Sequence, residues 1–388
     1  MVKSASVAVV GGGVVGASVA YHLAKRGVRD VVIFDRGTGP GNGSTSRATG
    51  GFRAQFHTPI NVHLSLLARD KLRAFPDEIG ADSGYRPYGY LFIAESEREL
   101  LWLRKTLATQ RSAGLTEACE LDADAVVDLN PAVIRDRVAG ATWCASDGFI
   151  RPMQILRGYL DAAERLGVRI EWNSDVREVS SRGKSRLNEL VISGGNVSVD
   201  SVVNAGGPWA GMLRCGNGST VPVKPLKRQV AQTVETTILP ESMPMTIFVD
   251  NGFHLRVRDG RVMLLKATQP LSDDPFDTTL EDGWISAVKR EADERIPVLR
   301  DVAIDREACH AGLYEMSPDD HAILGQSPQF ENLFLANGSS GHGVMHSPAL
   351  GQLLSEIICD GVASSLDVSA LRPTRFSERA PNPKSELL

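Results

Sequence analysis

Residues 5–35 read ASVAVVGGGVVGASVAYHLAKRGVRDVVIFD, and this stretch decides the fold. ASVAVV (5–10) and VVIF (31–34) are short apolar, β-branched runs, which predict two buried strands. Between them a helical stretch runs from about residue 14 to residue 26, and a glycine ends it. Strand, turn, helix and strand in this order predict a βαβ unit of an α/β protein with a parallel sheet.

The turn of this unit is rich in glycine. Gly11, Gly13 and Gly16 match the pattern GxGxxG, and Asp35 follows Gly16 by nineteen positions. The first glycine permits a tight turn, the second lets backbone N–H groups approach a pyrophosphate, and the third permits close helix–strand packing. The acid at this spacing is suited to a ribose hydroxyl. The stretch therefore predicts dinucleotide binding, and it does not distinguish FAD from NAD.

Arg36 follows the acid and has two interpretations. It either contacts a 2′-phosphate or is a solvated surface arginine, and the second is the more common role.

The bulk composition is that of an ordinary enzyme. The 388 residues are 42% hydrophobic and 23% charged, with a formal net charge of −5. The absence of a basic field argues against nucleic acid and anionic membrane surfaces as partners. The five cysteines lie far apart without a CxxC pair, which predicts reduced thiols and a cytoplasmic location. Residues 7–24 are mostly apolar, but four glycines and His22 argue against a targeting or membrane-spanning segment.

Residues 43–53 read GSTSRATGGFR, an unusual mixture of small, hydroxylic and arginine residues. A core element would carry larger apolar groups, and a flexible linker would not need two arginines. We predict a backbone that lies against a large, flat, partly anionic cofactor, with one arginine left to hold an acid group of the substrate.

Together with VNAGGPWA (203–210), GLYEMSPDDHAILG (312–325) and LFLANGSSGHGVMHSPALG (333–351), this stretch makes the chain resemble the FAD-dependent amine and amino-acid oxidoreductases. That family includes D-amino-acid oxidase, glycine oxidase, sarcosine oxidase, dimethylglycine dehydrogenase and the β subunit of dye-linked L-proline dehydrogenase. The resemblance implies a doubly wound, Rossmann-like FAD-binding domain (1–84, 147–224 and 310–375). It also implies an inserted α+β substrate domain on a mixed, largely antiparallel sheet (85–146 and 225–309). The polar end, 376–388, is expected to be a loose tail.

Local patterns agree with this organisation. Residues 154–167 place apolar side chains on one helical face, and residues 97–114 form a second helical stretch. In GFHLRVRDGRVMLLKA (252–267), Asp259-Gly260 lies between alternating runs and predicts a β-hairpin.

The resemblance implies a set of residues that hold FAD. SSGHG (339–343) precedes a short VMHSP step and then a predicted helix, so its free backbone amides would suit the pyrimidine end of the flavin. Val176 would contact adenine through its main chain. The predicted cofactor residues are Gly11, Gly13, Val14, Val15, Gly16, Asp35, Arg36, Ser44, Thr45, Arg47, Ala48, Thr49, Gly50, Val176, Ala205, Gly206, Trp209, Gly312, Gly338, Ser340, Gly341, His342, Gly343, Val344 and Met345.

Both positions that carry a covalent flavin bond in similar proteins are altered. Dimethylglycine dehydrogenase-like enzymes have a histidine where this chain has Arg47. Monomeric sarcosine oxidase has a cysteine two positions before a tyrosine, where this chain has Gly312 before Tyr314. We therefore predict FAD bound without a covalent bond.

Four residues are the candidates for the substrate side of the site: Arg53, His254, His342 and Met345. Arg53 matches the arginine that holds the substrate carboxylate in sarcosine oxidase, although it could instead pair with an internal acid. The lysine that assists it there falls at Met345 here, so Arg53 would act with another group such as His346 or His254. His342 would act through its backbone position or as a general base.

The electron acceptor stays open between oxygen and a redox partner. The lysine that promotes the oxygen reaction in sarcosine oxidase aligns at or near Met263, with Lys266 three positions away. The GSTxR stretch resembles the proline dehydrogenase β subunit more than the oxidases. An oligomer is possible on this evidence, and no membrane insertion is expected.

Asp319, Asp320 and His321 resemble a metal cluster, but adjacent residues rarely ligate one ion together. MSPDDHAILG is better interpreted as a turn, and we predict no metal site.

The leading hypothesis is an FAD-dependent enzyme that oxidises the C–N bond of a small amino acid or an N-substituted amino acid, giving an imine that hydrolyses. One alternative is an FAD dehydrogenase of a 2-hydroxy acid or of a glycerol-phosphate type, which would need a base. Another is a flavoprotein subunit of a larger complex without its own turnover.

Overall fold

The computed structural model describes residues 2–384 except 182, 184, 217, 219, 220 and 268–273. Its first sheet has nine strands in the order β12-β9-β10-β11-β1-β2-β8, with β19 beside β11 and β18 beside β19. The ladders that join β11, β1, β2 and β8, and that join β11 to β19, are parallel. The strands are β1 (Ser4–Val10), β2 (Val31–Phe34), β8 (Arg169–Glu171), β9 (Val176–Ser181), β10 (Leu187–Ile192), β11 (Gly195–Asn204), β12 (Arg214–Cys215), β18 (Ile323–Gln326) and β19 (Leu333–Asn337).

The central strands are buried on both faces, as expected for a parallel sheet. Val7 and Val9 of β1 pack with helices α1 (Val14–Lys25), α6 (Pro152–Arg165) and α8 (Gly343–Asp360). Ala8 of β1 and Phe34 of β2 pack in a second cluster, with side chains of β9, β10 and β11. The predicted α/β class and the predicted strand–helix–strand unit are confirmed.

The other helices are α2 (Pro59–Arg73), α3 (Phe75–Ile79), α4 (Glu97–Ser112), α5 (Ala123–Leu129) and α7 (Asp282–Arg295). Helices α4 and α6 confirm the two predicted helical stretches. Among the described residues, none of the helices is long and apolar enough to cross a membrane.

The second sheet has eight strands in the order β17-β13-β16-β15-β14-β4-β6-β5, and its ladders are antiparallel except the one between β14 and β4. It is therefore mixed and largely antiparallel, as predicted. Asp259 and Gly260 both have positive φ, 54° and 71°, between β15 and β16, as a two-residue hairpin requires. The strands are β4 (Tyr90–Ala94), β5 (Cys119–Leu121), β6 (Gly140–Cys144), β13 (Lys224–Gln232), β14 (Met245–Phe248), β15 (His254–Arg258), β16 (Arg261–Leu265) and β17 (His310–Met316).

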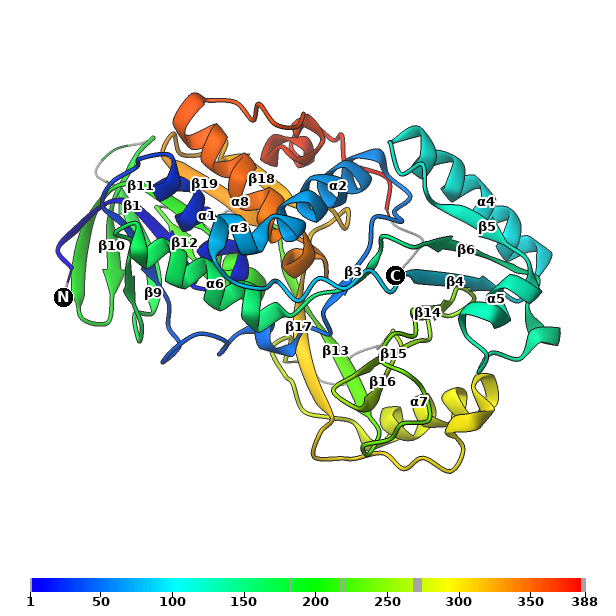
Figure 1. Ribbon diagram of the computed structural model, residues 1–388. Coiled ribbons are helices and arrows are strands. Elements are labelled where there is room, and N and C mark those ends of the chain that lie inside the picture. The colour runs from blue at the N-terminus through cyan, green and yellow to red at the C-terminus, as the bar shows by residue number, and fades with distance from the viewer. Residues whose placement is uncertain are drawn as a thin grey trace.

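Strand β17 differs from the sequence prediction, which assigned residues 310–316 to the FAD-binding part. It belongs to the second sheet, because it pairs with β13 from Lys224↔Met316 to Val230↔His310. Figure 1 shows β13 and β17 in the middle of the molecule, between the first sheet at the left and the rest of the second sheet at the right. Both strands therefore lie where the two sheets meet, and the division of the chain into domains stays a proposal.

Helix α8 begins earlier than predicted, at Gly343 rather than after VMHSP, and it contains Pro348. A proline has no N–H, so the carbonyl of Val344 loses its helical donor. The Ser347 hydroxyl donates to this carbonyl at 2.8 Å, which lets the helix continue through the proline. The early start brings the first turn of α8 to the cavity described below.

The predicted loose tail is attached to the body in its described part. The backbone N–H and the side-chain amide of Asn382 both donate to Asp319, at 2.9 and 3.1 Å. Residues 385–388 of the predicted tail lie outside the described residues.

Candidate active site

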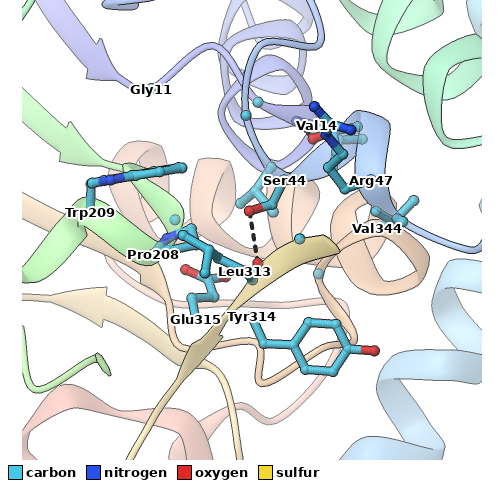
Figure 2. Close-up of a pocket in the computed structure, with 18 of the residues that line it drawn as sticks. Gly11, Val14, Ser44, Arg47, Pro208, Trp209, Leu313, Tyr314, Glu315 and Val344 are labelled. Carbon is cyan, nitrogen blue, oxygen red and sulfur yellow. Dashed lines mark hydrogen bonds between the residues drawn. The ribbon is translucent and has the colours of Figure 1, made fainter. Parts of the chain in front are cut away.

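A cavity of about 840 Å³ lies where the two sheets meet. It is large for a ligand site, since such sites span roughly 300–1,000 Å³. The glycine turn before α1, residues 43–51, the end of β11, strand β17 and the start of α8 all line it, and Figure 2 shows part of this wall. Every residue predicted for the site lines the cavity except Gly16 and Gly338. The structure thus brings together residues from the beginning, middle and end of the chain.

The glycine turn has little room for side chains. Gly11 has φ +108°, and a Cβ there would lie 2.3 Å from the Ala205 carbonyl oxygen. A Cβ on Gly16 would lie 2.0 Å from the Gly11 oxygen, so Gly16 acts by close packing although it does not line the cavity. A Cβ on Gly13 would lie 3.6 Å from the Thr45 hydroxyl oxygen, which is an ordinary contact distance. The turn is therefore open at Gly13, where a pyrophosphate could approach the N-terminus of α1.

Asp35 lies at the end of β2, on the cavity wall. Its Oδ2 accepts from the Gly12 N–H at 2.6 Å, and its Oδ1 accepts from the Gly37 N–H at 2.7 Å. These bonds fix the carboxylate beside the glycine turn, where it could accept from a ribose hydroxyl. Arg36 is exposed, as the second interpretation from the sequence expects, and its guanidinium lies 4.0 Å from the ring centroid of Trp209 in a cation–π contact.

The stretch 43–53 follows the cavity wall, with a 3₁₀ turn, η1, at Ser44–Arg47. The Ser44 hydroxyl donates to the Leu313 carbonyl of β17 at 2.7 Å, the bond drawn in Figure 2. A Cβ on Gly312 would lie 2.7 Å from the Cβ of Arg47. The two positions that carry the flavin bond in similar proteins are thus in contact, and neither residue is a nucleophile that could form such a bond.

This contact leads to a prediction about the cofactor bond. After acid precipitation and washing of the holoprotein, the flavin should be in the supernatant and the pellet should be colourless, because Arg47 and Gly312 offer no atom for a covalent bond. Absorption spectra of the two fractions measure this. A yellow pellet that survives washing would contradict the prediction.

The N-terminus of α8 forms the opposite end of the cavity. Gly343, Val344 and Met345 form its first turn, and the first N–H bonded within the helix is that of His346, to the His342 carbonyl at 3.0 Å. Amides of a first turn have no acceptor inside the helix, and the helix dipole adds positive potential there. This end could hold the part of the flavin on which negative charge develops during reduction.

Arg53 lies on the cavity wall, next to a backbone segment that a buried carboxyl group holds in place. Asp147 accepts from the Ala54 N–H at 2.7 Å and from the Gln55 side-chain amide at 3.1 Å, which fixes the backbone next to Arg53. The guanidinium of Arg53 is only 5% exposed, lines the cavity, and lies 4.4 Å from the ring centroid of Phe56. Burial lowers the pKa of Arg53, although the charge of Asp147 acts in the opposite direction. An anionic ligand would therefore stabilise the charged form of this guanidinium.

The histidines of the site are neutral at neutral pH. Arg53 Nη2 lies 3.2 Å from His342 Nε2, and since a guanidinium only donates, this nitrogen must accept. Burial, with the charge of Arg53 added, holds the pKa of His342 well below its ordinary value. Burial also lowers the pKa of His254 to about 4 and that of His346 to about 3. His254 lines the cavity but His346 does not, and neither supplies the second cation considered from the sequence.

Arg228 is a cation of the cavity that the sequence did not single out for the substrate. It lines the cavity, its guanidinium lies 5.5 Å from the ring centroid of Tyr314, and burial lowers its pKa. Lys227 points elsewhere, to Asp277 at 3.2 Å and Glu281 at 2.6 Å. Neighbouring residues on a strand point to opposite faces. The strand pattern of KPLKRQ (224–229) could therefore have shown that only one of Lys227 and Arg228 faces the cavity.

Of the two residues considered for the oxygen reaction, Met263 and Lys266, only Lys266 lines the cavity. Met263 is buried in the second sheet and does not line the cavity. Lys266 lines the cavity and forms an ion pair with Glu291. Met345, where sarcosine oxidase has its second cation, is a buried residue of the cavity wall.

A glycine turn before a helix, an acid at the end of the next strand and a second helix N-terminus around one cavity are the features of a dinucleotide-binding protein. Residues 6–357 match the family described as FAD dependent oxidoreductase (DAO), and the chain belongs to this family. FAD is therefore its cofactor, as predicted, and the enzyme is of the amine and amino-acid oxidase or dehydrogenase type. The residues of the cavity fit FAD in charge, backbone geometry and space.

Relatives match over nearly the whole chain. The chain is 28% identical to glycine oxidase of Geobacillus kaustophilus over 91% of its length and 92% of that protein, whose crystal structure gives a TM-score of 0.83. It is 27% identical to FAD-dependent oxidoreductase domain-containing protein 1 of Xenopus laevis, over 98% of the chain and 84% of that protein. The crystal structure of L-proline dehydrogenase from P. horikoshii shares the fold, with a TM-score of 0.89, 24% identity, and coverage of 98% and 100%.

Proposed function

We propose that the enzyme oxidises the C–N bond of a small amino acid or of an N-substituted amino acid. The observation that carries this proposal is a pair of guanidinium groups on the wall of the FAD cavity, those of the buried Arg53 and the half-buried Arg228. Bound FAD would accept a hydride at N5 from the carbon next to nitrogen, leaving an imine that water hydrolyses.

The arginines would bind the substrate carboxylate. A planar guanidinium can donate two parallel hydrogen bonds to a carboxylate and keeps its charge at any working pH. His342 accepts from one nitrogen of Arg53 and so would hold the plane of the guanidinium. Arg228 would take the role of the second cation, since His254 is neutral.

The same arginines would favour the reactive form of the amine. Hydride leaves readily only when the nitrogen has a free electron pair, so the substrate must be the neutral amine. Burial and two nearby positive charges both disfavour an ammonium group and lower its pKa. The weakly basic histidines do not offer the strong base that oxidation of a hydroxy acid would need.

Anaerobic mixing of the holoenzyme with a panel of compounds tests this function. We expect the flavin absorbance to bleach with an amino acid or an N-methyl amino acid, and not with the matching 2-hydroxy acid. Bleaching by the hydroxy acid would favour the alternative dehydrogenase, and bleaching by no compound would favour a subunit without its own turnover.

We propose that the enzyme is located in the cytoplasm. Its five cysteines are all free thiols, which supports a reducing, cytoplasmic location. We also propose that the first sheet with its helices forms the FAD-binding domain, and that the second sheet forms the substrate domain.

A further inference from the structure

Glu315 is a buried carboxyl group on the wall of the FAD cavity that has no part in the function proposed above. It lies on β17 next to Tyr314, and Figure 2 shows the two side chains leaving the strand in different directions, as the alternation of a strand requires. The residue is 9% exposed and lines the cavity. Its carboxyl end therefore approaches the cavity away from the phenol of Tyr314.

Only one of its two oxygens has a hydrogen-bond partner within the described part of the chain. Oε1 accepts from the Ser339 N–H at 3.2 Å, just before the start of α8. Oε2 is buried without a partner. A buried polar atom without a partner costs free energy, so its presence on a cavity wall points to a ligand or a proton that satisfies it.

Few charges act on this carboxyl group. Strand β13 places Pro225 opposite it, and of the flanking lysines Lys224 is exposed while Lys227 pairs with two acids. On the loop before α8 the only titratable side chain is His342, which is neutral. Two 3₁₀ turns contact β17: η3 (Gly207–Met212) has no titratable side chain, and η1 has Arg47, whose Cβ lies against Gly312 rather than Glu315. Burial therefore outweighs the hydrogen bonds from Ser339 and Gly338 and raises the pKa of Glu315 to about 7.

We propose that Glu315 stores a proton for the flavin: its Oε2 is a carboxylate oxygen when FAD is oxidised and gains a proton from solvent when FAD is reduced. A hydride brings two electrons and one proton, so it leaves one added negative charge in the cavity. That charge disfavours a second negative charge on Glu315 and raises its affinity for a proton. Reoxidation removes the charge, and the O–H bond breaks to return the proton to solvent.

The coupling is reciprocal. If reduction favours the protonated carboxyl group, then protonation of the carboxyl group favours reduction by the same free energy. The inference requires only that the chain binds FAD, and it does not depend on the identity of the substrate.

Potentiometric titration of the holoenzyme with redox dyes, at a series of pH values around neutrality, tests the proposal without any substrate. The slope of the midpoint potential against pH gives the number of protons taken up with each electron pair. Glu315 would have one pKa in the oxidised enzyme and a higher one in the reduced enzyme. Between these two pKa values, we expect the wild type to take up one proton more than Glu315→Gln when the flavin is reduced. Below this pH range, the midpoint potentials of wild type and variant should have the same slope against pH. Above it, the variant should have the higher midpoint potential, because it lacks the negative charge of the carboxylate.

Glu307→Gln removes an exposed carboxyl group and serves as the matched control, with the slope of the wild type. Glu315→Asp keeps a carboxyl group and should keep the additional proton, in a shifted pH range. A redox-difference infrared spectrum of the wild type should show a protonated carboxyl band on reduction, and Glu315→Gln should lack it.

Two results would overturn the proposal. One is an identical slope for wild type and Glu315→Gln together with weaker FAD binding, which would make Glu315 an acceptor for a cofactor hydroxyl and not a proton store. The other is the absence of the carboxyl band in the wild type, which decides the matter even if neither variant folds.

Discussion

Arg53→Met is expected to lower kcat/KM for amino-acid substrates by roughly 30- to 3,000-fold, because removal of one partner of a buried charge pair costs about 2–5 kcal/mol. Arg53 is 5% exposed, so water cannot replace its hydrogen bonds to a substrate carboxylate. Methionine keeps much of the apolar contact with Phe56 but removes the charge and both donors. Most of the loss should appear in KM, with a smaller loss in kcat from poorer positioning of the carbon that gives up the hydride.

Two measurements separate this role from a structural one. The methyl ester of the same amino acid lacks the anion, so wild type and Arg53→Met should oxidise the ester at similar rates. The FAD content of the purified variant should equal that of the wild type, because Arg53 itself is not among the predicted FAD contacts.

Arg214→Met is the matched control. Arg214 also lines the cavity, but it is exposed and forms an ion pair with Glu178, so its loss should leave kcat/KM nearly unchanged. An equal loss for the acid and its ester in Arg53→Met would show that Arg53 maintains the shape of the cavity and does not bind the carboxylate.

The sequence predicted those parts of the site that depend on neighbours along the chain. The glycine turn, Asp35 and the hairpin at Asp259-Gly260 follow from local backbone geometry, which a few consecutive residues determine. The long stretch 43–53 was recognisable because its composition suits neither a core element nor a linker. These predictions needed no knowledge of which strands pair.

The sequence could not predict features that arise from pairing between distant segments. The place of β17 beside β13 decides that Tyr314 and Arg228 lie together, and no local pattern encodes that register. The charge state of Glu315 depends on the complete surroundings of one carboxyl group, including a loop more than twenty residues further along the chain. The buried partner of Asp319 was missed for the same reason, since it lies in the segment after α8.

Asp319→Asn is expected to lower the free energy of unfolding by about 3–5 kcal/mol, the usual cost of leaving a buried charge without its partner. Asp319 is 1% exposed and Arg375 is fully buried. Arg375 donates from Nε at 2.8 Å and from Nη2 at 2.9 Å to the two carboxylate oxygens. Asparagine presents an NH₂ group to one of these donors, so it removes one bond and leaves the guanidinium charge uncompensated.

The effect should depend on pH in a definite direction. Burial disfavours the charged form of Asp319, but the hydrogen bonds from Arg375 and Asn382 outweigh burial and hold its pKa well below the ordinary value. A lowered pKa in the folded state gives stability that is complete above the unfolded pKa of about 3.9 and is lost as the pH falls below it. The difference between wild type and Asp319→Asn should therefore be constant near neutrality and shrink in acid.

Urea unfolding of the apoprotein, followed by circular dichroism at several pH values, measures this difference, and Asp320→Asn is the matched control. Asp320 is half-buried and has φ +61°, a conformation that asparagine also adopts, so this change should alter the unfolding free energy by less than about 0.5 kcal/mol. Because Asn382 binds the same carboxylate, Asp319→Asn should also make the C-terminal segment more sensitive to limited proteolysis. Equal stabilities for the two variants would mean that Arg375 finds compensation from the carbonyls of Leu371 and His321 that it already contacts, and that the ion pair contributes little.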